Sequence, residues 1–503
     1  MKKNIISALL LAAVILSSCG EAAQTTALST TALQESAQPE ATTAAETEPD
    51  PFESFDYGGE SIRIHISSND ATGFGAADFL LAGVGEETGD VVSDSVFFRN
   101  RKVEELLNVK LEYTALDANF NDAPVAIKKI IGSGEDAYDL FINDLFPVTN
   151  LVLQGYFLDL SEAPYFDWTK DYWYEGYMSE LSLDGVHRYQ MAGDYFIDVL
   201  RSSHALYFNR RLAQNYFEDP DVFYKAVLDN KWTCETFLSY IEKCYLDLNG
   251  NSAIDREDQF GFTVCTRWGG LIPWIIACDL TYVEPDGAGG LNLAMNNERS
   301  VKTLEMMNRI FYSGATDCSE VLGASDVVKD SLNMFKEGRA LILGYQRLGT
   351  AEVLRDMEDE IGVLPYPKLD ENQEKYMTST HDTTEIGVIP ITCTKFDTLC
   401  AVIEVLNRET KNFVLPAYYE TGLKVKYTRD DLSGQMIDLI RANIGGSFVL
   451  AYANKVNNAF ISAAFQTPLV AQSTDFASNY AKIEKSTQKQ LSKVVATFSE
   501  IGQ

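Results

Sequence analysis

The stretch APVAIKKIIGSGEDAYDLFIND, residues 123–144, decides the fold class of this chain. Its first half is a helical stretch that Gly132 or Gly134 ends, and its second half contains the apolar strand YDLFIN. Glycine is common at helix ends because it adopts left-handed backbone angles without strain. A helix that leads through a short turn into a buried strand is typical of a parallel sheet covered by helices.

The same order of elements occurs before and after this stretch. ESIRIHIS (60–67) alternates like a strand, and SDSVFFRNRKVEELLNVKLEY (93–113) has the pattern of a helix followed by a strand. In SLNMFKEGRALILGY (331–345), Gly338 suits a left-handed helix end, and the apolar strand 340–343 is typical of one buried on both faces. IGVLPYP (361–367) and TEIGVIPI (384–391) predict further strands, and 476–498 predicts an amphipathic terminal helix. We therefore predict an α/β fold with C-terminal helices.

The first residues have the pattern of an export signal. Lys2 and Lys3 precede the apolar run 5–16, which is shorter than the roughly 20 residues of a membrane-spanning helix. The sequence LSSC then ends at Cys19 and resembles a bacterial lipobox, in which the cysteine becomes the lipidated N-terminus. We predict a lipoprotein signal peptide over 1–18. An ordinary secretory signal is the alternative, and no transmembrane helix is predicted elsewhere.

The segment 19–57 is rich in Ala, Thr and Glu and contains no Lys or Arg. Such a composition cannot bury enough apolar surface to offset the entropy of ordering, so we predict a disordered tether. About 35 residues of coil have a reach of roughly 30–35 Å. The remainder of the chain is too long for a single core, which predicts two lobes or more.

The charge and the cysteine content argue against several classes of binding partner and of structural site. The net charge is −32, from 41 Lys and Arg against 73 Asp and Glu, which argues against nucleic acid and anionic lipid as partners. The seven cysteines after Cys19 are odd in number and contain no CxxC pair, so neither zinc nor a disulfide framework is expected.

Signatures of catalysis are missing. The sequence contains no GxSxG, HExxH or GxxxxGK[ST] motif, and GFGAAD at Gly73 departs from GxGxxG at its last position. The four histidines are scattered without metal-ligand spacing. We predict no catalytic residues and no enzyme activity. A carbohydrate-active enzyme with two converging carboxylates stays open, because sequence alone does not show convergence.

Candidate binding residues come from strand ends and from aromatic clusters. Ligands of open α/β sheets bind beyond the carboxyl ends of strands, which selects Asn143, Asp144 and Tyr345. Two clusters, YFDWTKDYWYEGY (165–177) and TRWGGLIPWIIACD (266–279), contain Trp173 and Trp268. Flat aromatic faces suit the C–H faces of sugar rings, although most aromatic residues serve in packing.

An ordered set of segments resembles one family. The segments are LSSC (16–19), LVLQGYFLDLSEAP (151–164), ALYFNRRLA (205–213), KWTCETF (231–237), DLNGNSAIDREDQFGF (247–262), MFKEGRALIL (334–343), IGVLPYPK (361–368) and VLPAYYETGLKVKYTRDD (414–431). Together they resemble bacterial extracellular solute-binding proteins of ABC importers, family 1, whose members bind sugars.

The resemblance implies the type 2 periplasmic-binding-protein fold, in which two α/β lobes close on a solute like a hinge. Chain crossings are expected near 193–197, 382–387 and 430–440. The first lobe is expected to comprise 58–194 and 387–435, and the second 195–386 and 436–503.

The resemblance also implies a site and partners. The expected ligand-binding residues are Asn143 and Asp144 from the first lobe, Trp268 from the second, Tyr195, Tyr345 and Asp382 near the hinge, and Trp173. The expected protein is a monomer, extracellular, anchored by its N-terminal lipid, that delivers a carbohydrate to the permease and ATPase subunits of an importer. The alternatives are a surface glycan-binding or sensory protein without a transporter, and a receptor for a peptide or polyamine.

The stretch 247–262 also follows the spacing of an EF-hand calcium loop. Asp247, Asn249, Asn251, Ala253, Asp255 and Asp258 occupy positions 1, 3, 5, 7, 9 and 12. Position 6, which favours Gly, is Ser252, and position 12, which favours Glu, is an aspartate. Either a weak structural Ca²⁺ site or a metal-free loop held by Asx-turns fits this pattern.

Overall fold

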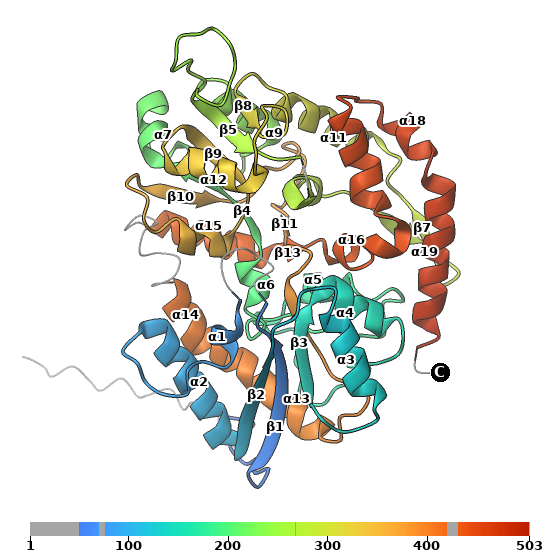
Figure 1. The fold of residues 1–503 in the computed structure, drawn as a ribbon. Helices are drawn as coiled ribbons and strands as arrows, with labels where there is room; N and C mark the ends of the chain where they lie inside the picture. Colours follow the sequence, from blue (N-terminus) through green and yellow to red (C-terminus); the bar gives the residue numbers. More distant parts are fainter. Residues whose placement is uncertain (1–49, 70–75, 267, 420–430, 502–503) are drawn as a thin grey trace, which may run out of the picture. The chain divides into compact units, whose positions relative to one another are not determined.

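The computed structural model describes residues 50–69, 76–266, 268–419 and 431–501. Residues 51–503 form one compact unit (Figure 1). The predicted signal peptide, Cys19 and the tether up to residue 49 lie outside the described residues. Phe52 is buried and packs edge-on against Phe55 and Tyr165, so folded structure begins before residue 57, the predicted end of the tether.

The first sheet has four strands in the order β12-β3-β1-β2. Its strands are β1 (Glu60–Ser67), β2 (Val109–Leu116), β3 (Leu140–Asp144) and β12 (Glu385–Val388). β1 is parallel to β2 and β3, while β12 is antiparallel to β3. The main helices of this lobe are α2 (Val91–Leu107), α3 (Ala123–Gly132), α4 (Leu145–Val152) and α13 (Phe396–Glu409).

The second sheet has five strands in the order β10-β4-β9-β5-β8. Its strands are β4 (His204–Asn209), β5 (Phe260–Val264), β8 (Thr316–Cys318), β9 (Ala340–Arg347) and β10 (Ile361–Leu364). Every residue of β9 is buried, as the apolar run predicts. The main helices are α7 (Arg210–Phe217), α8 (Val222–Leu228), α9 (Cys234–Ile241), α11 (Glu298–Phe311) and α12 (Val327–Lys336).

Short elements connect the two lobes. α6 (Asp198–Arg201) leads into β4, and β11 (Thr378–Ser379) pairs in parallel with β13 (Ile444–Gly445) between the two sheets (Figure 1). After β11 the chain enters β12 of the first sheet. The predicted α/β, two-lobed fold class is therefore confirmed.

Two details differ from the sequence-based expectation. α15 (Asp431–Ala442) packs against β10 of the second sheet, although the predicted lobe boundary at 435 assigns its first turn to the first lobe. The predicted terminal helix over 476–498 is two helices, α18 (Phe476–Ala481) and α19 (Glu484–Ser499), because the chain turns at 482–483.

The C-terminal helices contact both lobes. α16 (Ser447–Ala451) packs against α4, whereas α18 packs against α11 and α19 against β7 (Leu291–Leu293). The remaining elements are α1 (Asp78–Leu81), α5 (Glu175–Ser179), α10 (Ile272–Ala277), β6 (Val283–Pro285), α14 (Leu415–Tyr418) and α17 (Thr467–Val470). No helix among the described residues has the length and apolar character needed to cross a membrane.

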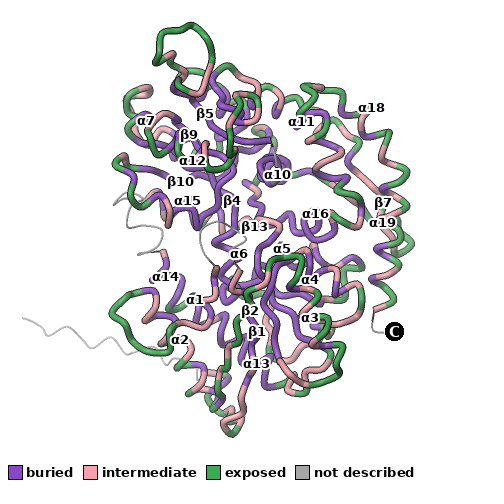
Figure 2. The backbone as a smooth tube through the Cα atoms, in the orientation of Figure 1, coloured by how far each residue is buried: buried purple, intermediate pink, exposed green. Residues whose placement is uncertain are grey.

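Glycine ends two of the helices as expected. Gly134 has φ +76° after α3, and Gly338 has φ +69° after α12. The Gly338 N–H donates to the carbonyl of Phe335, which satisfies one of the free carbonyls at the helix end. Buried residues fill the space around both sheets (Figure 2), and Trp232 and Trp274 are among the largest fully buried side chains.

Candidate functional site

Carboxyl groups from separate segments converge where the chain crosses between the lobes. Asp144 ends β3, Asp198 begins α6 and Glu385 begins β12. Asp144 and Glu385 are paired across the two strands, and Asp198 Oδ2 accepts a hydrogen bond from the Glu385 N–H at 3.1 Å. All three residues are buried, and Asp382 lies three residues before Glu385 with a half-exposed side chain. We call Asp144, Asp198, Asp382 and Glu385 the hinge carboxyl cluster.

Two guanidinium groups lie beside the hinge carboxyl cluster. The fully buried Arg201 has Nη1 3.7 Å from Asp198 Oδ1 and Nη2 3.3 Å from Glu352 Oε2. Burial raises the pKa of Asp198, and the charges of Arg201 and, to a smaller extent, Arg347 oppose that rise. Counting Glu352, five carboxyl groups face two guanidinium groups, so the site has an excess of acidic residues.

Burial and mutual repulsion shift the pKa values of the cluster. Burial, with the charges of Asp198 and Asp382, raises the pKa of Asp144 to about 8. Burial, followed by the charges of Asp198 and Asp144, raises the pKa of Glu385 well above its usual value. The Asp144 side chain makes no hydrogen bond or ion pair with any described residue. A protonated carboxyl can both donate and accept hydrogen bonds, so Asp144 is available to a polar ligand.

Tyr345 is the aromatic residue that the structure places beside this cluster. It has φ +53°, a left-handed angle that is strained for a non-glycine residue, and its N–H donates to the Tyr366 hydroxyl at 2.9 Å. The Arg347 guanidinium lies 5.7 Å from the centre of its ring. Burial first, with the charge of Asp382 among smaller causes, raises the pKa of Tyr345. The centre of the His204 ring lies 6.2 Å from that of the Tyr345 ring and 6.1 Å from that of the ring of His381, the residue before Asp382. The charge of Asp382 also contributes to the raised pKa of Asp144, so three of the predicted residues lie in one region.

The predicted residue Trp268 lies in the turn Trp268–Gly270, directly before α10. A Cβ on Gly269 would come within 2.7 Å of the Tyr345 ring, so this turn lies against Tyr345. The side chain of Trp268 is outside the described part of the structure.

Three predicted residues lie apart from the cluster or are engaged in packing. Tyr195 is fully buried, and its hydroxyl lies 3.1 Å from the Tyr113 hydroxyl. Trp173 is also buried and donates its indole N–H to Glu404 Oε2 at 3.0 Å. Both side chains have partners within the first lobe. Asn143 is 1% exposed, its amide has no partner in the described residues, and alternation along β3 turns it away from Asp144.

Four residues in or beside the hinge carboxyl cluster were not predicted from the sequence: Asp198, Arg201, Arg347 and Glu385. Asp198 follows the predicted crossing at 193–197, and Glu385 lies within the crossing at 382–387. Charged residues in or beside crossing segments were the signal that could have identified these two.

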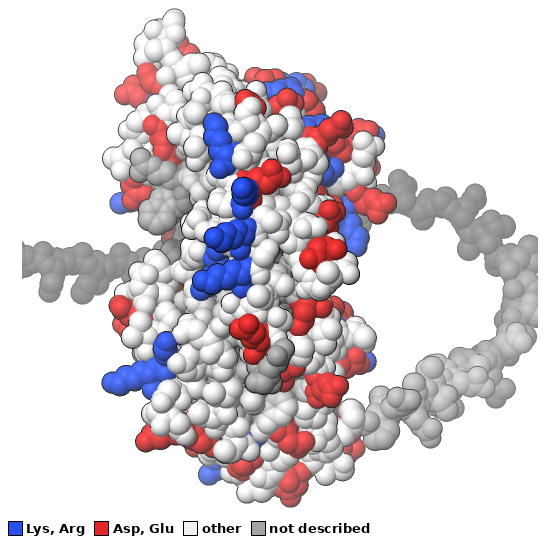
Figure 3. Space-filling view, turned by 90° about the vertical axis from the view of Figure 1, so that its right-hand side faces the viewer, with Lys and Arg blue, Asp and Glu red and all other residues white. Residues whose placement is uncertain are grey.

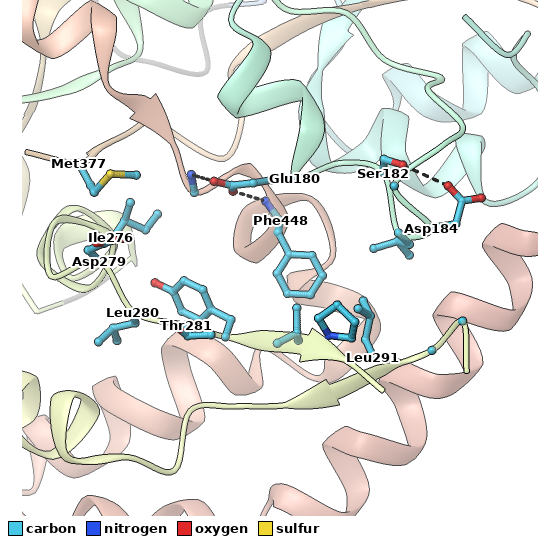
Figure 4. A pocket seen from close by; sticks show the side chains of 18 of the residues that line it. Glu180, Ser182, Asp184, Ile276, Asp279, Leu280, Thr281, Leu291, Met377 and Phe448 are labelled. Carbon is cyan, nitrogen blue, oxygen red and sulfur yellow. Dashed lines mark hydrogen bonds between the residues drawn. The ribbon is translucent and has the colours of Figure 1, made fainter. Parts of the chain in front are cut away.

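A separate pocket of about 530 Å³ lies beside the crossing strands (Figure 4). It is lined by 180–185 after α5, by 276–291 around α10, β6 and β7, and by Met377, Gly446 and Phe448. Glu180 closes one side by accepting hydrogen bonds from the N–H groups of Gly446 and Phe448, at 3.1 and 3.3 Å. Of the predicted ligand-binding residues, none whose side chain is described lines this pocket, although its volume is typical of small-molecule sites.

Side-chain hydrogen bonds hold the EF-hand-like stretch in a closed loop. Asp247 accepts from the N–H groups of Gly250 and Ser252, at 2.6 and 2.9 Å, and Asn251 Nδ2 donates to Asp255 Oδ2 at 2.7 Å. Asp258 is fully buried and accepts from the Asp255 N–H at 3.1 Å.

Ser252 has φ +61° at the position where EF-hands favour glycine, which is a strained angle for serine. The oxygen donors suit Ca²⁺ chemically. No group of three or more His, Cys, Asp or Glu side chains in the described ranges is arranged to hold a metal. Ca²⁺ binding here stays a prediction.

Comparison with solved structures identifies the fold. The cyclic α-maltosyl-1,6-maltose-binding protein of Arthrobacter globiformis superposes with a TM-score of 0.56 at 13% identity, over 87% of this chain and 99% of that chain. The maltose-binding periplasmic protein MalE of Listeria monocytogenes, in complex with maltose, gives 0.54 at 13% identity, over 86% and 98%. An ABC transporter solute-binding protein of Thermotoga lettingae, bound to α-D-tagatose, gives 0.51 at 12% identity, over 88% and 100%.

No protein-family model matches the sequence, and no curated protein matches it either. At 12–13% identity these likenesses concern the fold. It is the two-lobed architecture of periplasmic binding proteins.

Proposed function

We propose that this chain is a solute receptor that binds a carbohydrate between its two lobes and delivers it to an ABC importer. The observation that carries the proposal is the convergence of Asp144, Asp382 and Tyr345 where the chain crosses between the sheets. A ligand that contacts residues from both lobes at a crossing stabilises one hinge angle over others. Binding therefore changes the arrangement of the lobes, which an importer can detect.

The chemistry of the site suits a polyol. Asp144, with its raised pKa, can donate to one sugar hydroxyl and accept from another, and Asp382 adds a half-exposed acceptor. The rings of Tyr345 and Trp268 would supply flat faces for the C–H side of a sugar. Two of the proteins of similar fold were solved with a bound carbohydrate, α-D-tagatose or maltose, and a third is named for binding cyclic α-maltosyl-1,6-maltose. These ligands support a carbohydrate as the solute.

The proposed cellular setting follows from the lipobox-like sequence at Cys19. An extracellular, lipid-anchored monomer would capture solute and pass it unaltered to the permease, with the ATPase subunits supplying energy on the other side of the membrane. No catalytic step is proposed.

A cationic solute is the second candidate, because five carboxyl groups lie beside only two guanidinium groups. A bound ammonium group would favour the ionised forms of carboxyl groups that hold a proton in its absence. A thermal-shift screen that includes maltose, D-tagatose, maltotriose and spermidine separates the two ligand classes. Stabilisation by spermidine alone would reject the carbohydrate.

Replacement of Trp268 with Ala is expected to weaken binding of the carbohydrate found in that screen by about 10–100-fold, because a stacked aromatic face contributes roughly 1–3 kcal/mol. Isothermal titration calorimetry measures the change. Phe120→Ala, at a surface aromatic residue that is 39% exposed, is the control and should bind like the native protein. Unchanged affinity in Trp268→Ala would remove Trp268 from the site.

Calcium at 10 mM is expected to stabilise the protein by about 1.4–2.7 kcal/mol if the loop binds it with a dissociation constant of about 10⁻⁴–10⁻³ M. Thermal melts with calcium, with EDTA and with magnesium measure the shift. Asp255→Ala should abolish the calcium effect, since Asp255 is the proposed ligand at position 9 and lies partly exposed in the loop. Identical melts in calcium and EDTA would establish the metal-free loop.

A further inference from the structure

The C-terminal helix α19 carries a row of unpaired lysines on its outer face. Lys485, Lys489 and Lys493 recur every four residues, and Lys482 lies one turn earlier. All four are exposed, because Leu491, Val494 and Phe498 turn the opposite side of the helix into the protein. Figure 3 views the molecule from the side on which α19 lies and shows basic side chains forming a row. We call Lys482, Lys485, Lys489 and Lys493 the lysine row.

No ion pair with a described residue neutralises the charges of the lysine row. Some exposed lysines elsewhere pair with carboxylates, as Lys225 does with Asp219 and Lys302 with Asp370, both at 2.6 Å, whereas others such as Lys110 have no such partner in the described part of the chain. Lys485, Lys489 and Lys493 form no ion pair with a described residue. Lys482 donates only to the neutral amide of Asn479, at 3.0 Å. Glu284 and Glu484 line a surface hollow together with Lys485 and Lys489.

The composition of this helix face indicates what kind of partner it fits. Between the lysines the outer positions are Ser486, Ser492 and Ala496, so the face has no aromatic or large apolar residue. Protein–protein interfaces depend on such anchors, with arginine favoured over lysine. A row of lysines spread over about 12–16 Å at 1.5 Å per residue instead fits a partner recognised through repeated negative charge.

We propose that the lysine row docks on the anionic phospholipid headgroups of the membrane. The net charge of −32 belongs to the whole chain, so it does not describe the local charge of the surface around the lysine row. At physiological ionic strength the screening length is about 8 Å, so a flat surface senses the charges within one or two turns of the helix that faces it. Each lysine near an anionic leaflet contributes attraction of its own. Docking would lay α19 along the membrane, independently of which solute the protein binds.

Vesicle co-sedimentation tests the proposal. Residues 19–503 with Cys19→Ser, which lack both the predicted signal peptide and the attachment site of any lipid, are mixed with vesicles of phosphatidylglycerol and phosphatidylcholine or of phosphatidylcholine alone, at 50, 150 and 500 mM NaCl. The protein with the native lysine row should partition at least tenfold better onto vesicles with phosphatidylglycerol than onto phosphatidylcholine alone at 50 mM NaCl. At 500 mM NaCl this difference should disappear. Equal partitioning onto both vesicles overturns the proposal.

Matched variants assign the effect to the lysine row. Lys485→Glu, Lys489→Glu and Lys493→Glu together should lose at least tenfold in partitioning. The control combines Lys110→Glu, Lys329→Glu and Lys336→Glu, which changes the net charge equally at exposed lysines on β2 and α12. It should stay within twofold of the native protein. Replacement of the same three row lysines with Arg should retain binding. If the row variant and the control variant lose partitioning equally, at unchanged thermal stability, a role for the lysine row is rejected.

Discussion

Asp144→Asn is expected to stabilise the protein by up to about 4 kcal/mol at pH 7 and to have little effect at pH 4. The folded pKa of Asp144 is about 8, whereas an aspartate in the unfolded chain has a pKa of about 3.9. The folded state therefore holds a proton that the unfolded state has released throughout this window. The contribution of Asp144 to stability is therefore most favourable below pH 4 and falls by roughly 1.4 kcal/mol per pH unit up to pH 8. Asparagine carries no charge at any of these pH values and removes this contribution.

Urea unfolding from pH 4.5 to pH 8.5 measures the effect. The curve of the native protein should slope downward with pH more steeply than that of Asp144→Asn. Asp198 and Glu385 also have raised pKa values, so the variant should retain part of the slope. Asp229→Asn, at an exposed aspartate after α8, should match the native protein. Parallel curves for native and Asp144→Asn would show that Asp144 has an ordinary pKa.

Such a stabilising substitution has a functional meaning. A buried carboxyl that lowers stability at neutral pH is typical of a binding site, where polar groups are held ready for a ligand. Asp144→Ala, which removes both the donor and the acceptor, should therefore weaken binding of the solute while it raises stability.

Arg201→Met is expected to destabilise the protein by about 3–5 kcal/mol at pH 7. Arg201 is fully buried and lies between the buried Asp198 and the partly exposed Glu352, so its loss removes an ion-pair partner of both carboxylates. Arg201→Lys should recover little, because an ammonium group does not span both carboxylates as a planar guanidinium does. Chemical denaturation at constant pH measures the change in unfolding free energy.

Two further variants separate charge from packing at Arg201. Asp198→Asn added to Arg201→Met should recover part of the loss, since it removes one of the stranded charges. Arg188→Met is the surface control. Arg188 pairs with Glu175, whose side chain is 42% exposed, so its loss should cost no more than about 1 kcal/mol. A loss in Arg201→Met as small as in Arg188→Met would show that Arg201 does not hold the hinge carboxyl cluster together.

Local patterns predicted the elements of the fold well. The apolar run Ala340–Leu343 has no polar face, and β9 is buried along its whole length. Gly338 ends α12 with a left-handed angle, as glycine does where other residues would be strained. The helix and strand in 123–144 are α3 and β3. The hydrophobic periodicity predicted one helix over 476–498 and missed the turn at 482–483. An apolar pattern can continue in register across a short turn between two helices.

The candidate site was predicted less completely, for a reason that lies in long-range contacts. Tyr195 and Trp173 were selected by position and residue type, but their partners Tyr113 and Glu404 are far away in the sequence. Nothing in a local segment distinguishes an aromatic residue that meets a ligand from one that meets another side chain.

By itself, the sequence determined the α/β class, the buried strands and the polar residue Asp144 at the end of β3, because hydrophobic periodicity and helix-end chemistry act over a few residues. Only the tertiary structure decided that Asp198, Arg201 and Glu385 lie near Asp144, and that Lys485, Lys489 and Lys493 on one face of α19 form no ion pair with a described residue. Burial and electrostatic interactions depend on distances through space, which are set only when separate segments pack together.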